Sequence, residues 1–260
     1  MKRFVPTLSL LLVATMAHAQ APMVSRGFEV GEYEGVPWPI IPPPFDGPYP
    51  AAPRFGVPPA AATRGGERVM TLVDQIRSTL RSSAYTHTTR VRPRDGLYDW
   101  DCSGMAAWVL RQAAPVAMRR ISRERPVARD FVQQIESAPV GRARAGWQRL
   151  DRIETAMPGD LFAWRRPRGF PSHNTGHVGF VLDRPVAVVG IPGGWAVRIA
   201  DSSSFVHQDD SRASDTDGGF GIGTIVFLAD ASGHATHYGW WGTASAGYVV
   251  TPIVFGRVSR

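Results

Sequence analysis

The fold is decided around Pro158-Gly159-Asp160-Leu161-Phe162-Ala163-Trp164, where the pattern of apolar residues changes its period. Pro-Gly-Asp is a turn-forming sequence, and the short apolar run after it is typical of a buried β-strand. Apolar residues recur at helical spacing before this point, and apolar runs separated by Gly and Pro follow it. Helices followed by strands predict an α+β domain with an antiparallel sheet and the helices packed on one face.

Four more apolar runs follow this first strand and predict a central sheet of about five strands. The expected strands are His177–Leu182, Trp195–Ala200, Thr224–Leu228 and Tyr248–Val258. Glycine- and proline-containing turns separate them, as in an antiparallel sheet with short connections.

Two strong helical patterns precede the strands. An apolar stripe between Val69 and Leu80 predicts one helix, and a second helix should begin at or just after Cys102 and end at Pro115. Weaker helical patterns occur at Val127–Ser137 and Gly146–Ala156. The first pattern and the start of the second lie in an Arg-rich stretch, 119–152, that we interpret as a helical insertion.

The N-terminus has the pattern of a secretory signal peptide. Met1-Lys2-Arg3 is followed by an apolar stretch and by Ala17-His18-Ala19, which is typical of a cleavage site after Ala19. We therefore expect 1–19 to be removed and the protein to be periplasmic or secreted; the alternative is an uncleaved anchor. Elsewhere no stretch approaches the roughly 20 apolar residues of a membrane span.

Residues 20–63 are dominated by Pro, Gly and Ala with interspersed aromatic residues. Proline is excluded from helix interiors and central strands, so this segment should be an extended arm or linker. The aromatic residues favour an arm that packs on the domain. We expect 64–260 to form a single folded domain.

Composition limits the classes of function. The apolar content of 43% fits a globular protein, and the formal net charge of +7 would fall to +5 on loss of Lys2 and Arg3. A modestly basic exported protein can associate with acidic envelope polymers. Nucleic acid is disfavoured as a partner because the charge is scattered and no binding motif accompanies it.

Cys102 is the only cysteine of the chain. Exported proteins usually carry cysteines in pairs or none, because a lone thiol outside the cytoplasm can oxidise or mispair. A buried structural thiol is one explanation and a catalytic thiol is the other. The neighbours Asp101-Cys102-Ser103-Gly104 favour catalysis. Asp101 is a good N-cap, and the positive end of the helix then favours the thiolate at Cys102.

The base of a catalytic cysteine must come from elsewhere in the chain. His177 stands at the start of a strongly apolar strand, between the small residues Gly176 and Gly179. A histidine at the mouth of a strand, facing a helix N-terminus, is the geometry that a Cys–His pair needs. Small Ser103 beside the cysteine leaves room for a substrate carbonyl, and the Cys102 N–H could act as an oxyanion donor.

Three short motifs in this order resemble the NlpC-type papain-like cell-wall peptidases. They are Asp101-Cys102-Ser103-Gly104 at a helix start, Pro158-Gly159-Asp160-Leu161-Phe162 at a strand start, and Gly176-His177-Val178-Gly179 on the next strand. The resemblance extends from about Val69 to Val258 and implies a papain-like fold. It also implies a Cys/His/polar triad that hydrolyses amide bonds in peptidoglycan stem peptides.

The resemblance also implies further site residues. The third member of the triad, which orients His177, would be Asp201, although the family more often has histidine there; a turn residue is the alternative interpretation. A family tyrosine near the oxyanion site corresponds to Tyr85, with Tyr98 as a rival. Trp240 is a candidate for lining the substrate groove or for the core. The sequence gives no ligand set for a metal or cofactor.

Two features depart from the family pattern. Cys102 and His177 are 75 positions apart, which is longer than the family usually shows, and the segment 205–223 matches nothing in its general pattern. We therefore keep two alternatives to a monomeric peptidoglycan hydrolase. One is an acyltransferase or non-wall amidase that uses the same thioester. The other is a non-catalytic envelope-binding domain.

Overall fold

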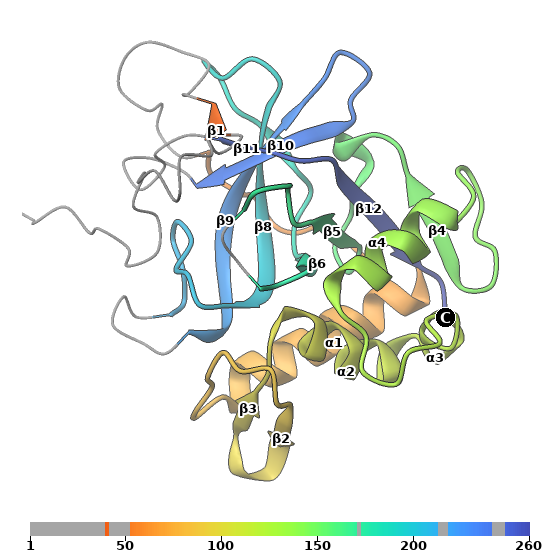
Figure 1. Cartoon of the computed structure of the whole chain (residues 1–260), viewed down its shortest axis with the longest axis vertical. Coiled ribbons are helices and arrows are strands. Elements are labelled where there is room, and N and C mark those ends of the chain that lie inside the picture. The colour runs from red at the N-terminus through yellow and green to blue at the C-terminus, as the bar shows by residue number, and fades with distance from the viewer. Residues whose placement is uncertain (1–39, 42–52, 171–172, 213–217, 241–247) are drawn as a thin grey trace, which may run out of the picture.

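A computed structural model describes residues 40–41, 53–170, 173–212, 218–240 and 248–260. The chain is an α+β protein, as the sequence predicts (Figure 1). The expected number of strands was wrong, because the main sheet of the described residues has ten strands rather than about five.

The main sheet is antiparallel throughout, in the order β1-β11-β10-β9-β8-β6-β5-β12-β4, with β7 paired to β8. Its strands are β1 (Ile40–Ile41), β4 (Trp147–Leu150), β5 (Leu161–Arg165), β6 (Gly176–Val181), β7 (Val186–Ala187), β8 (Gly194–Ser203), β9 (Gly219–Ala229), β10 (Ala235–Trp240), β11 (Tyr248–Val250) and β12 (Ile253–Val258). A separate hairpin joins β2 (Arg90–Arg92) to β3 (Leu97–Asp99).

The helices are α1 (Arg64–Thr79), α2 (Cys102–Ala113), α3 (Pro115–Met118) and α4 (Ala128–Ser137), and they gather on one side of the sheet (Figure 1). The predicted stripe on α1 is the buried face, with Val69, Val73 and Ile76 at most 2% exposed. Helix α2 packs on β6 and β8, so its first residue lies over the strands that carry His177 and Asp201.

The sheet curls on itself. Strands β10 and β12 are not neighbours in the hydrogen-bonded order, yet they contact each other, and the ring of Trp164 on β5 stacks on that of Tyr238 on β10 at 4.2 Å. A second apolar cluster, which includes Val197, Ile225 and Phe227, fills the inside of this curl. The helices and this inner cluster thus bury opposite faces of the sheet.

The predicted helix at Gly146–Ala156 is wrong. Trp147, Leu150 and Ile153 are spaced by three, which mimics a helical stripe, but residues 147–150 form β4 and a 3₁₀ turn covers Ile153–Thr155. Strand pairing with β12 overrides the local pattern, because Trp147 lies opposite Val258 with its indole buried and its N–H donated to the carbonyl of Ala117 at 2.7 Å.

The predicted signal peptide lies outside the described residues, as does most of the predicted arm. Within that arm, Ile40–Ile41 pairs with β11 at the edge of the sheet. In the described part of the chain, no helix combines the length and the hydropathy that crossing a membrane would require.

Candidate active site

Cys102 is the first residue of α2. The carboxylate of Asp101 caps the helix by accepting the Gly104 N–H at 2.6 Å and the Ser103 hydroxyl at 2.8 Å. The N–H groups of the first helical turn have no acceptor within the helix, so they give this end of α2 a partial positive charge. The Cys102 thiol lies at that positive end. The Cys102 residue is 4% exposed, which places its sulfur at the edge of the core.

His177 lies on β6, next to the end of the strand that faces α2. Gly176, directly before it, has a φ of 144°, and a Cβ there would collide with the carbonyl of Trp164. Glycine therefore lets β6 begin in this position. The imidazole packs against the indole of Trp164, with ring centroids 4.9 Å apart, and lies close enough to Cys102 for the charge of that thiol to act on its pKa.

Asp201 lies on β8, the strand next to β6. Its Oδ2 lies 2.8 Å from His177 Nε2, and its side chain is fully buried. With Nε2 bound to a carboxylate, Nδ1 is the nitrogen left for the thiol. The structure thus brings the three predicted triad residues, Cys102, His177 and Asp201, together, with a hydrogen bond between His177 and Asp201.

Charges around His177 favour the imidazolium. Burial opposes ionisation, but the Cys102 thiolate and the hydrogen bond to Asp201 outweigh it and raise the pKa of His177 to about 9. The imidazolium is therefore the favoured form of His177, with Cys102 and Asp201 as its acidic neighbours.

Asp201 is held ionised in spite of its burial. Burial alone would raise its pKa, but the His207 imidazole, the Arg212 guanidinium and the His177 hydrogen bond hold the pKa of Asp201 well below its usual range. A permanently ionised carboxylate fixes the tautomer and ring orientation of its histidine.

One buried hydrogen bond links the two halves of the site. The Ser202 hydroxyl, next to Asp201 on β8, donates to the carbonyl of Trp100 at 2.9 Å. Trp100 directly precedes the Asp101 cap, so this bond ties the start of α2 to the strand that carries the carboxylate.

Tyr85 lies beside the thiol, as the family resemblance implies. Burial, followed by the charges of Cys102 and Asp101, raises the pKa of its hydroxyl, which therefore stays protonated. The Asn174 side-chain amide donates to the Tyr85 oxygen at 3.1 Å. The phenolic proton is then available to another acceptor. The rival Tyr98 is fully buried, with its hydroxyl 2.8 Å from Thr79.

An open pocket lies beside His177, with a volume of about 630 Å³ when the open space at its mouth is included. Its walls combine aromatic rings with polar side chains. The lining includes Tyr85, Trp164, Phe170, Asn174, His177 and Tyr238. An apolar cavity with a few polar groups and a residue of perturbed pKa is the usual form of a ligand site.

The other two predicted substrate-binding residues are less informative. The Ser103 side chain is buried and its hydroxyl bonds to Asp101, so it supports the cap. Trp240 ends β10 opposite Ile225, and its side chain lies outside the described part of the structure.

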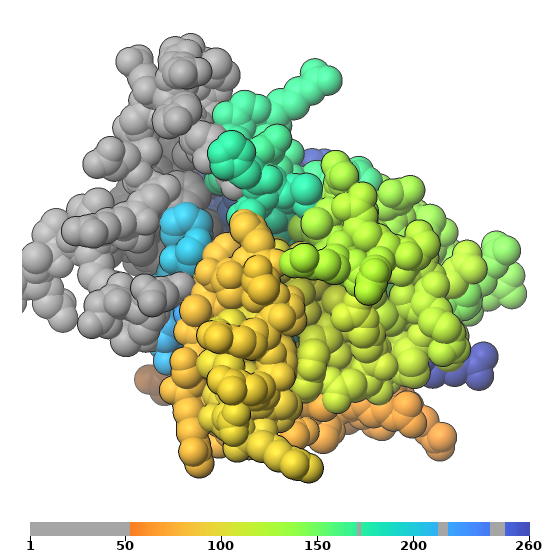
Figure 2. Space-filling model, turned by 60° about the horizontal axis from the view of Figure 1, so that its bottom comes forward, coloured from red at the N-terminus to blue at the C-terminus, as the bar shows by residue number. Residues whose placement is uncertain are grey.

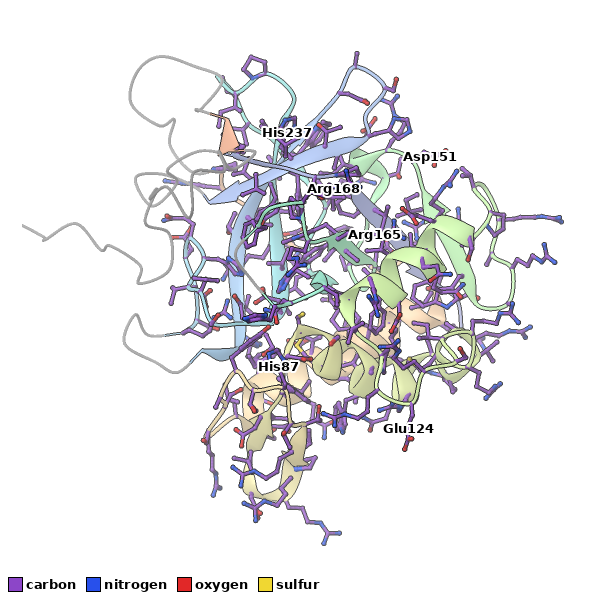
Figure 3. All side chains as sticks on the ribbon, in the orientation of Figure 1. His87, Glu124, Asp151, Arg165, Arg168 and His237 are labelled. Atoms are coloured by element: carbon purple, nitrogen blue, oxygen red, sulfur yellow. The ribbon has the colours of Figure 1, made fainter. Side chains whose placement is uncertain are left out.

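Sequence reasoning missed Asn174, His207, Asp210 and Arg212, which contact members of the site. It also missed His87, whose Nδ1 lies 3.1 Å from the Asp101 cap. In Figure 3, His87 lies below His237, between the lower end of the sheet and the β2–β3 hairpin. The only available signal for the first group was that the segment 205–223 departs from the family pattern while it contains a histidine, acids and an arginine.

The chain was compared with protein-family models, with curated proteins and with solved structures, and none of the three comparisons found a match.

Proposed function

We propose that the chain is a papain-like cysteine hydrolase of the NlpC type that cleaves amide bonds by way of a thioester on Cys102. The observation that carries this proposal is the line Cys102–His177–Asp201 at a helix N-terminus. These residue types in this order match the roles of nucleophile, acid–base and orienting carboxylate.

In the first step, the Cys102 thiolate attacks the carbonyl carbon of the amide. The developing oxyanion accepts hydrogen bonds from the Cys102 N–H and from the Tyr85 hydroxyl. The His177 imidazolium then donates its Nδ1 proton to the leaving nitrogen, the C–N bond breaks, and the amine departs. The acyl group remains on sulfur as a thioester.

In the second step, water enters and neutral His177 takes one of its protons. The resulting hydroxide attacks the thioester carbonyl, the C–S bond breaks, and a carboxylic acid is released. Cys102 returns to the thiolate and His177 to the imidazolium. Asp201 accepts a hydrogen bond from the His177 Nε2–H throughout both steps, and its own charge does not change.

Peptidoglycan stem peptides are the substrate that the family resemblance favours. A predicted signal peptide and a modestly basic charge agree with action on an acidic polymer outside the cytoplasm. The pocket beside His177 would receive the residue next to the cleaved bond.

The experiment is digestion of purified cell walls by the protein without residues 1–19, with products identified by mass spectrometry. We expect wild type to release soluble peptide fragments and Cys102→Ala to release none. A matched control is Ser78→Ala, an exposed hydroxyl at the end of α1, which should behave as wild type.

Equal release by wild type and Cys102→Ala would contradict the mechanism. If defined muropeptides are never cleaved but acylated products form when an amine is added, the same thioester serves acyl transfer instead. No turnover of any amide or ester would leave the non-catalytic alternative.

A further inference from the structure

The segment that connects β8 to β9 contributes a second set of charged residues to the site. It runs beside the stretch between α1 and β2, where Figure 2 shows the two segments next to each other on the surface. Three of its described side chains nevertheless point inward: those of His207 and Arg212 are 3% exposed and that of Asp210 is fully buried. Charged groups are buried at such levels only when they are paired.

Every N–H of the Arg212 guanidinium has an acceptor, and an arginine has five. Nε and one terminal nitrogen bind the carboxylate of Asp210 at 3.0 and 2.6 Å. The other terminal nitrogen donates to the carbonyls of Ser203 and Gly219, which close the two ends of the segment. The fifth bond reaches Asp201 Oδ1 at 3.0 Å.

The two oxygens of Asp201 are therefore used differently. Oδ2 lies 2.8 Å from the Nε2 atoms of both His177 and His207, while Oδ1 is bound by Arg212. A carboxylate bound at both oxygens cannot rotate without breaking several hydrogen bonds. By binding Oδ1, Arg212 thus also fixes the position of Oδ2, the oxygen that faces His177.

Strand β9 is shaped to receive this segment. Gly221 and Gly223 are two residues apart, so they lie on the same face of the strand. A Cβ at Gly221 would collide with the guanidinium of Arg212, and one at Gly223 would lie 2.6 Å from the Cβ of His207. The glycine run beginning at Gly219 therefore provides space for buried charged side chains.

We propose that Arg212, held by Asp210, is a positioning residue of the active site that fixes the Asp201 carboxylate for His177. The inference rests on the proposed function, since it assigns Arg212 a part in the same triad. Arg212 itself contacts neither the thiol nor the substrate pocket, so it acts through Asp201.

The groups that face Asp201 are His177, His207 and Arg212, with Tyr85 and Cys102 beyond His177 and Asp210 beyond Arg212. Lysine cannot replace Arg212, because an ammonium has three donors and no planar fork. Without the guanidinium, the carboxylate shifts or takes up a proton. Either change weakens its hydrogen bond to His177.

The test is an NMR titration of His177 in the purified protein labelled at histidine Cε1, with the signal assigned by its loss in His177→Gln. This reads the His177 pKa without any substrate. In wild type the ring should titrate near pH 9. Arg212→Met should lower the titration midpoint by about one to two pH units, the size expected for one lost hydrogen bond to a charged group.

A second variant should displace the Arg212 guanidinium from Asp201 while keeping its positive charge. Gly221→Ala places a methyl group where the guanidinium lies, so it should lower the midpoint in the same direction as Arg212→Met. The matched control is Arg257→Met, which removes another arginine that binds a buried carboxylate through two nitrogens, that of Asp160. This control should leave the His177 midpoint at the wild-type value.

A role through Asp201 also makes the effects non-additive. In an Asp201→Asn background, adding Arg212→Met should produce no further change in the midpoint. The proposal is overturned if folded Arg212→Met and Gly221→Ala titrate as wild type or at a higher midpoint, which is what loss of a nearby positive charge alone would give. It is also overturned if Arg257→Met shifts the midpoint equally, or if the effects of Asp201→Asn and Arg212→Met simply add.

The two experiments distinguish a wrong assignment of the reaction from a wrong assignment of the role of Arg212. A protein that cleaves no amide but shows these shifts in the His177 midpoint retains the positioning role of Arg212 and loses the assigned reaction. A protein that cleaves cell walls but shows no shift retains the reaction and loses the role of Arg212.

Discussion

At the scale of single residues, the site depends on a carboxylate that stays ionised inside the protein. Asp201 is fully buried and is contacted by two imidazoles and one guanidinium. The sequence predicted this residue only through the family resemblance, from its place on the strand that follows His177. Its ionisation depends on His207 and Arg212, whose approach to Asp201 is set by tertiary structure and not by local pattern.

Replacing Asp201 should impair turnover far more than binding. We expect Asp201→Asn to lower kcat about 10²- to 10⁴-fold, since the amide neither fixes the His177 tautomer nor stabilises the imidazolium. Steady-state kinetics on a soluble peptide substrate would measure this. Asp183→Asn is the control, because this buried carboxylate lies beyond the other end of β6 and should leave kcat unchanged.

The pH dependence follows from the raised pKa of His177. Because the folded-state pKa is about 9 and the unfolded value about 6.5, the imidazolium's stabilising contribution is complete below about pH 6.5 and is lost as pH rises through about 9. Activity should fall along the same alkaline limb, because the leaving amine then lacks its proton donor. A pH–rate profile that shows no decline up to pH 10 would contradict this assignment.

At the scale of elements, the helix start was predictable and the extent of the sheet was not. Asp101 caps α2 as its sequence indicates, because capping is a local interaction. Strands such as β4 and β10 have no clear alternating pattern of their own and are fixed by their partners β12 and β9. The contacts of the segment after β8 are likewise set by tertiary structure and not by a local sequence pattern.

Removing the cap should affect both stability and reactivity. Asp101→Ala leaves the Gly104 N–H and the Ser103 hydroxyl without their acceptor, so the free energy of unfolding should fall by about 1 kcal/mol. Urea denaturation would measure this, and the rate of Cys102 alkylation should also change. Thr63→Ala removes the corresponding cap of α1 and should lower stability without altering alkylation. Equal alkylation in both variants would argue against a role of the cap at the thiol.

At the scale of the whole molecule, the curled sheet holds the strands of the site between two apolar layers. The helices cover one face, and the cluster around Phe227 fills the other. Sequence periodicity predicted the helices on one face, since their stripes are local. The curl depends on contacts such as that between Trp164 and Tyr238, which are far apart in sequence, so no local pattern indicates it.

The inner cluster should be essential for stability. Phe227→Ala should lower the free energy of unfolding by about 3–5 kcal/mol, because it leaves a cavity at a fully buried position. Urea denaturation followed by tryptophan fluorescence and by circular dichroism would measure this. Val57→Ala, at a 94% exposed side chain, should change stability by less than about 0.5 kcal/mol. A small effect of Phe227→Ala would mean that the curl is not part of the core.

The central claim is that Cys102 and His177 form a reactive pair, and the rate of Cys102 alkylation by iodoacetamide across pH tests it most directly. In wild type we predict substantial reactivity well below pH 7. In His177→Ala the rate should be low at neutral pH and rise only near the value of a free thiol, about 8.5. Identical profiles for wild type and a folded His177→Ala variant would contradict the pair and the mechanism built on it.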